Sequence, residues 1–144
     1  MIERLSANIV STFMRSGVNG RMNEYPQVLQ ASTVIGNKVV NPTGEQLGNV
    51  KELVIDVEDG RIAYAVLSFG GFLGLGDKLF AIPWEALMRN AKDNTFILDV
   101  NKEVLKEAPG FDKDHWPNDA QYEAGWLLDI YEYYGNSPYW MPDK

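Results

Sequence analysis

The chain has 144 residues, of which 45% are apolar, and its 20 acidic and 13 basic residues give a formal net charge of −7. This length predicts one globular domain with a sizeable core, and the acidic surplus argues against nucleic-acid binding, which requires a surplus of Lys and Arg. The absence of cysteine excludes disulfides and thiolate chemistry, and the single histidine, His115, excludes sites that need two imidazoles.

Residues 1–30 form an N-terminal extension. Four apolar residues have roughly the spacing of an amphipathic helix, namely Ile2, Leu5, Ile9 and Phe13. Gly17 follows them and ends any such helix. Polar residues interrupt the apolar stretch, so it does not resemble a signal peptide, and no stretch approaches the roughly 18 apolar residues of a membrane span. We therefore expect a short helix or a frayed tail, no membrane insertion and a cytoplasmic location.

The centre of the chain, residues 31–111, is predicted to be a domain of short strands separated by turns. Apolar runs predict these strands at 34–35, 39–40, 50–57, 62–69, 78–82 and 95–100, with a short strand or turn at 84–88. Asp59-Gly60 predicts a hairpin with a type I′ turn, and Asn101 is a suitable N-cap for a helix over 102–108. Five or six strands without long helices between them indicate a small closed all-β barrel.

Residues 112–144 form a C-terminal extension that is both acidic and aromatic. It contains seven acidic residues and two lysines, a net charge of −5, and eight of the 17 aromatic residues lie between Trp116 and Trp140. Residues 120–131 carry one helical apolar stripe, and Gly135 is a natural end of that helix. A segment so rich in aromatic residues is expected to be ordered, packed either on its own barrel or on another chain.

Several motifs in the central region resemble, in the same order, those of the PRC-barrel family. They are Val34-Ile-Gly-Asn37, Gly44, Gly48-Asn-Val50, Leu53-Val-Ile-Asp56, Asp59-Gly60-Arg61, Tyr64-Ala-Val-Leu67, Gly70-Gly-Phe-Leu-Gly-Leu-Gly-Asp-Lys78 and Ala81-Ile-Pro-Trp84. The resemblance implies a six-stranded β-barrel that acts as a docking module, with no catalytic residues to transfer. The family includes the barrel of the photosynthetic reaction-centre H subunit and the C-terminal domain of the ribosome maturation factor. These 144 residues contain neither the membrane helix of the first nor the RNA-associated domain of the second, so they are most similar to the small stand-alone members.

Three motifs suggest chemistry but have simpler explanations. The glycine-rich loop at 70–76 lacks the Gly-Lys-Ser/Thr and the following helix that a phosphate-binding loop needs. The acids around His115 do not follow the order of a calcium-binding loop, so we expect no metal. The acids near strand ends, Asp56, Glu58, Asp59 and Asp99, show no set separation, and Asp59 is explained by the turn. We therefore expect neither an enzyme nor a bound cofactor.

The best candidates for contact with a partner are apolar residues in the glycine-rich loop and in the C-terminal extension. They are Phe72, Leu73, Leu75, Trp126, Ile130, Tyr133, Tyr134, Tyr139 and Trp140. They favour a non-catalytic protein-interaction or assembly module that self-associates as a homo-oligomer. Two alternatives stay open: an accessory factor in ribosome assembly that binds a protein component, and a stress-related carrier of a small ligand.

Overall fold

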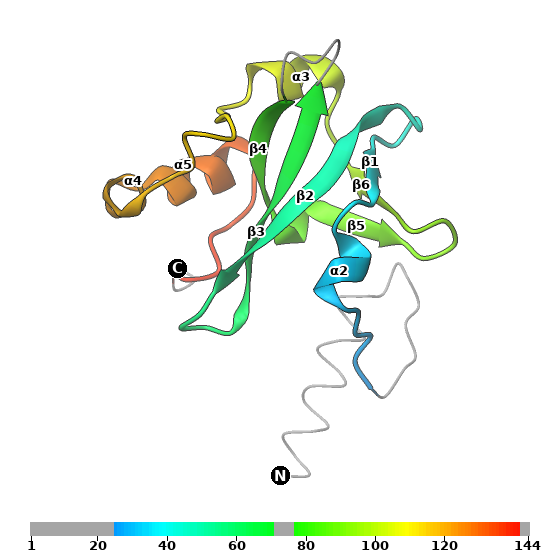
Figure 1. The fold of residues 1–144 in the computed structure, drawn as a ribbon, viewed down its shortest axis with the longest axis horizontal. Helices are drawn as coiled ribbons and strands as arrows, with labels where there is room; N and C mark the ends of the chain where they lie inside the picture. Colours follow the sequence, from blue (N-terminus) through cyan, green and yellow to red (C-terminus); the bar gives the residue numbers. More distant parts are fainter. Residues whose placement is uncertain (1–24, 71–76, 142–144) are drawn as a thin grey trace.

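Six short strands form the centre of the molecule (Figure 1). In the computed structural model, which describes residues 25–70 and 77–141, they are β1 (Lys38–Val40), β2 (Gln46–Asp56), β3 (Arg61–Gly70), β4 (Asp77–Pro83), β5 (Leu87–Asn90) and β6 (Thr95–Leu98). The strands hydrogen-bond in the order β4-β3-β2-β1-β6-β5. All neighbours are antiparallel except β1 and β6, which run parallel.

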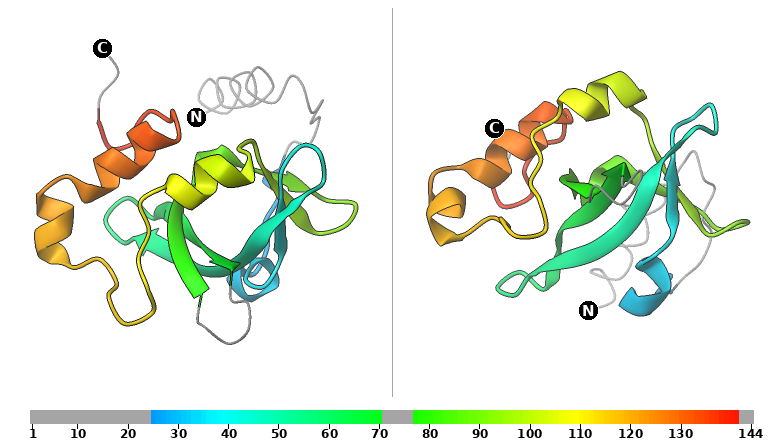
Figure 2. Two further views of the ribbon diagram at one scale, coloured as in Figure 1. Left: turned by 90° about the horizontal axis from the view of Figure 1, so that it is seen from above. Right: turned by 45° about the horizontal axis from the view of Figure 1, so that its top comes forward.

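The sheet curls into a half-barrel, as the two views in Figure 2 show. Its end strands, β4 and β5, are joined by no ladder in the described part of the chain. The chain instead passes from one to the other through the 3₁₀ helix η2 (Trp84–Ala86). The predicted six-stranded barrel fold is therefore confirmed, but the expectation of full closure is wrong, because β5 has only four residues and pairs with β6 alone.

The main core lies on the inner side of this curled sheet. Its buried side chains come from all strands except β5 and include Leu47, Leu67, Phe80, Ile82, Phe96 and Leu98. Two short helices, α2 (Ala31–Val34) and α3 (Lys102–Glu107), add Val34 and Leu105. The predicted N-cap of α3 is confirmed, because Oδ1 of Asn101 accepts a hydrogen bond of 2.8 Å from the backbone N–H of Val104.

The first predicted strand, at 34–35, is wrong. Residues 31–34 form α2, and pairing with β2 begins only at Lys38. Gly36 lies between them with φ +97°, and its N–H donates to the carbonyl of Val50 at 2.7 Å. This turn redirects the chain, so that only residues 38–40 run alongside β2.

The predicted hairpin at Asp59-Gly60 is confirmed, but the two-residue type I′ turn is wrong. Strand β2 ends at Asp56 and β3 begins at Arg61, so the loop has four residues. Gly60 has φ +69°, whereas Asp59 is not among the described residues with positive φ. Oδ1 of Asp56 accepts hydrogen bonds from the N–H groups of Glu58 and Asp59, each 3.0 Å long, and these bonds fix the wider loop.

The C-terminal extension forms two helices and a returning tail rather than one continuous helix. Helix α4 (Asp119–Glu123) is followed by Gly125, whose φ of +91° turns the chain into α5 (Trp126–Tyr133). Gly135 ends α5 as predicted. It has φ +74°, and the N–H groups of Gly135 and Asn136 donate to the carbonyls of Glu132 and Tyr131, which is a Schellman motif.

Candidate interaction surface

The C-terminal extension packs on the outer face of β3 and β4. These two strands are therefore covered on both faces. Along β4, Phe80 and Ile82 point into the main core, whereas Leu79 and Ala81 face a second cluster with Ile130. Figure 1 shows α5 lying beside β4. Burial on both faces explains why these two strands are nearly continuous apolar runs in the sequence.

Helix α5 is anchored by Tyr131, which is fully buried. Its hydroxyl donates a hydrogen bond of 2.6 Å to the carbonyl oxygen of Ala63 in β3. Burial raises the pKa of Tyr131 above its usual value, and the negative charge of Glu85 raises it further. The neutral hydroxyl is the form that can donate this bond.

The start of α5 is held by a cluster of three aromatic rings. Trp126 packs edge-on against Tyr64 of β3 at 5.7 Å and against Tyr122 of α4 at 5.6 Å between ring centroids. The hydroxyls of Tyr64 and Tyr122 form a hydrogen bond of 2.5 Å. Burial and then this bond raise the pKa of Tyr64. Within this cluster Tyr64 is buried and Trp126 is half-buried, whereas the ring of Tyr122 stays exposed at the surface.

After α5 the tail returns to the β2–β3 hairpin, as Figure 1 shows. The hydroxyl of Tyr139 donates a hydrogen bond of 2.5 Å to Oδ2 of Asp56, and the guanidinium of Arg61 lies 4.0 Å from the centre of the Tyr139 ring. Trp140 packs edge-on against the rings of Tyr131 and Tyr139, with centroid distances of 4.9 and 5.1 Å. The tail is thus fixed on its own barrel by polar and aromatic contacts.

These contacts leave an apolar surface exposed around the hairpin, which we call the hairpin–tail patch: Val57, Trp140 and Met141. Their exposed fractions are 88%, 41% and 44%. Val57 follows Asp56 in the chain, and Trp140 and Met141 follow Tyr139, so each lies close in the chain to one of the two residues that form the Tyr139–Asp56 bond. Charges flank the patch, because Arg61 lies beside Asp59 at 4.0 Å and is also paired with Glu85.

The structure separates the predicted partner-binding residues into different environments. Ile130 is 1% exposed and belongs to the chain's own core, so its prediction as a contact residue is wrong. Trp126, Tyr134 and Tyr139 are half-buried against the barrel, whereas Tyr133 and Trp140 are exposed. Phe72, Leu73 and Leu75 lie outside the described residues.

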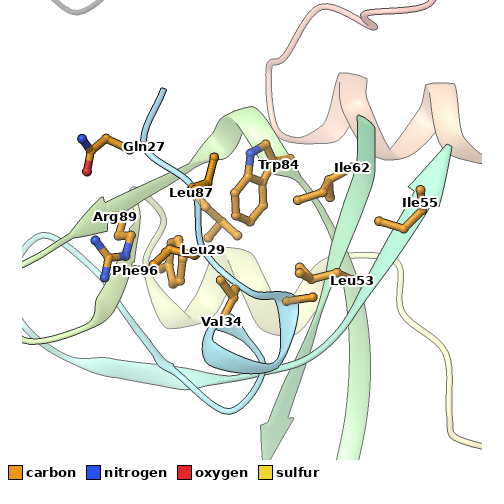
Figure 3. A pocket seen from close by; sticks show the side chains of 12 residues that line it. Gln27, Leu29, Val34, Leu53, Ile55, Ile62, Trp84, Leu87, Arg89 and Phe96 are labelled. Atoms are coloured by element: carbon orange, nitrogen blue, oxygen red, sulfur yellow. The ribbon is translucent and has the colours of Figure 1, made fainter. Parts of the chain in front are cut away.

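A pocket of about 540 Å³ lies beside α2, between side chains of β2 and β3 and side chains of β5 and β6 (Figure 3). Apolar side chains from six elements line it, among them Val34, Leu53, Ile62, Trp84, Leu87 and Phe96. The segment before α2 also contributes to its lining through Gln27, Val28 and Leu29. No local sequence pattern indicates this pocket, because its walls come from residues far apart in the chain.

The remaining polar candidates are dispersed. His115 donates or accepts one hydrogen bond of 2.7 Å with Asp112, and both side chains are exposed. This contact raises the pKa of His115 and lowers that of Asp112. Over residues 25–70 and 77–141, no group of three or more Asp, Glu or His residues is placed to hold a metal ion. In the same ranges, no helix is long and apolar enough to cross a bilayer.

A small curled sheet of six strands, followed by helices that cover one outer face, defines a barrel-type β domain. Comparison with known families assigns it more closely: the PRC-barrel domain matches residues 26–105, which is more than half of the chain. The chain therefore belongs to the PRC-barrel family, as its motifs indicated. No curated protein gives a significant match.

Proposed function

We propose that the chain is a non-catalytic protein-interaction module that self-associates through the hairpin–tail patch. The observation that carries the proposal is Trp140, which is fixed by two ring contacts and still 41% exposed. Aromatic and Met side chains are enriched in protein interfaces, and a side chain that is already ordered loses little entropy on binding. An exposed Trp beside an exposed Met and Val is costly on a surface that meets only water.

A second copy of the same chain is the partner that the patch fits best. A two-fold interface brings the same surface of both copies together, so the surface must complement itself. The hairpin–tail patch has an apolar centre and carries both signs of charge at its border, through Arg61 and Asp59. Across a two-fold axis, Arg61 of one copy can therefore meet Asp59 of the other. This local balance matters because the whole chain has a net charge of −7.

Light scattering coupled to size-exclusion chromatography tests this proposal. The wild type is expected to form a dimer, and the double variant Trp140→Ser, Met141→Ser is expected to be a monomer with an unchanged far-UV spectrum. Trp116→Ser is the matched control, because Trp116 is exposed to a similar extent, 37%, but packs against Phe111 at the far end of the extension. A monomeric wild type, or a dimer that survives the double substitution, would refute the proposal.

A further inference from the structure

The pocket beside α2 is not used by the proposed interaction surface. Its volume of about 540 Å³ lies in the range of small-molecule sites. Its floor belongs to the main core, since Val34 and Phe96 are buried there. Trp84 and Phe96 form one aromatic wall, with ring centroids 5.7 Å apart and planes inclined at 57°. Such a wall accommodates an apolar body.

One side of the pocket is formed by a segment that is weakly attached. Residues 25–29 make no hydrogen bond with any other part of the described chain, and Leu29 is 47% exposed although it lines the pocket. Figure 3 shows this segment crossing the mouth of the pocket, with Leu29 on the same side as Phe96. A side held only by side-chain contacts can shift to admit a ligand without breaking backbone hydrogen bonds.

Among the described residues that line the pocket, Arg89 is the one with a charged side chain. Figure 3 shows it next to Phe96. Nη2 of Arg89 donates one hydrogen bond of 2.8 Å to Oδ1 of Asn94, and Arg89 forms no ion pair within residues 25–70 and 77–141. Most of its donors thus remain available at the edge of an apolar cavity, in a protein whose net charge is −7.

We propose that this pocket binds a medium-chain fatty acid, with the apolar chain against Trp84 and Phe96 and the carboxylate on Arg89. A planar guanidinium suits a carboxylate, to which it can donate two parallel hydrogen bonds. The apolar walls favour a ligand whose remaining part carries no polar group. This proposal is independent of self-association through the hairpin–tail patch, because the two surfaces share no residue.

Titration calorimetry of the full chain with decanoate and with 1-decanol tests the proposal. Decanoate is expected to bind at one site per chain, and 1-decanol to bind roughly fivefold more weakly, because it lacks the charge. Arg89→Gln is expected to weaken decanoate binding to the level of 1-decanol. The matched control is Lys92→Gln, which removes a cation from the β5–β6 loop, three residues after Arg89 and outside the residues that line the pocket.

Two further variants locate the ligand. Leu29→Asp introduces a charge at an exposed position of the mouth and is expected to weaken both ligands. Decanoate is expected to change the tryptophan fluorescence of the wild type but not that of Trp84→Phe. The proposal is overturned by absence of decanoate binding up to about 1 mM, or by equal binding of both ligands. It is also overturned by Arg89→Gln binding decanoate like the wild type. A dimer that Leu29→Asp dissociates would show instead that a second copy fills the pocket.

Discussion

The hydroxyl of Tyr139 donates a hydrogen bond of 2.5 Å to Oδ2 of Asp56, although the two residues are 83 positions apart. Among the contacts that lower the pKa of Asp56 from its usual value of 3.8, this bond has the largest effect, and the backbone N–H of Asp59 has the next largest. A carboxyl whose pKa is lowered on folding stabilises the folded state above its unfolded pKa. That stabilisation is lost as the pH falls through the folded value.

Tyr139→Phe is therefore expected to raise the pKa of Asp56 toward 3.8 and to make the stability less dependent on pH below about pH 4. The pKa is measured by NMR titration of the side-chain carboxyl carbon, and the stability by urea denaturation between pH 2 and 6. Asp112 is the internal reference, because its lowered pKa depends on His115 and stays the same in the variant. An unchanged pKa for Asp56 would contradict this account.

Tyr131→Phe is expected to reduce the free energy of unfolding by about 1–2 kcal/mol, because it leaves the carbonyl of Ala63 buried without its partner. Tyr133→Phe provides a comparison on the same helix. The Tyr133 hydroxyl also donates a hydrogen bond of 2.6 Å, to the carbonyl of Val104, but this bond is exposed and water can replace it. Chemical denaturation of both variants measures the difference. Equal losses would show that burial does not set the strength of the Tyr131 bond.

Gly48→Ala is expected to destabilise the sheet by about 3 kcal/mol or more, since no movement of a side chain can relieve the clash. A Cβ at Gly48 would lie 2.1 Å from the carbonyl oxygen of Ser68 on the neighbouring strand. Gly60→Ala separates this clash from backbone strain. Gly60 has φ +69° and nothing within 4 Å of an added Cβ, so its substitution is expected to cost only about 1 kcal/mol. Thermal denaturation ranks the two variants, and a larger loss for Gly60→Ala would be the contrary result.

Truncation after Phe111 is expected to expose the outer face of β3 and β4. It removes Ile130 and the rings that cover Tyr64, Val66 and Leu79, while Phe111 keeps its bridge to Leu79. The shortened chain is expected to bind a hydrophobic dye more strongly than the full chain and to aggregate on mild heating. If it stays soluble and equally stable, and keeps the oligomeric state of the full chain, the extension is neither core nor interface.

Much of the barrel could be predicted from the sequence because its information is local. Alternating apolar residues, Asp59-Gly60 and Asn101 each act within a few positions, and the corresponding hairpin and helix start are present. The apolar runs of β3 and β4 held a further signal. They lack the polar alternation of a sheet with one face in water, and the structure shows both faces covered. That pattern could have indicated that the C-terminal extension packs on these strands.

The details that were missed depend on contacts between distant residues or on one overlooked glycine. The apolar stripe over 120–131 predicts one helix, but Gly125 lies within it and takes the left-handed conformation that divides it. The bond between Tyr131 and Ala63 joins residues 68 positions apart, and no local pattern specifies such a pairing. The burial of Ile130 follows from this docking, since a helical stripe does not reveal which surface it meets.

The short strand β1 gives the domain an internal seam. On one side it pairs antiparallel with β2, and on the other it holds β6 through only two register pairs, Val39 with Phe96 and Val40 with Ile97. The sheet therefore consists of a three-stranded meander, β2–β3–β4, and a hairpin, β5–β6, which are joined by the three residues of β1. Native-state hydrogen exchange should resolve them as separate cooperative units, with the β5–β6 amides opening at a lower free energy than those at the β2–β3 interface. Because β1 and β6 are far apart in the chain, closing this seam is also expected to be a late step of folding.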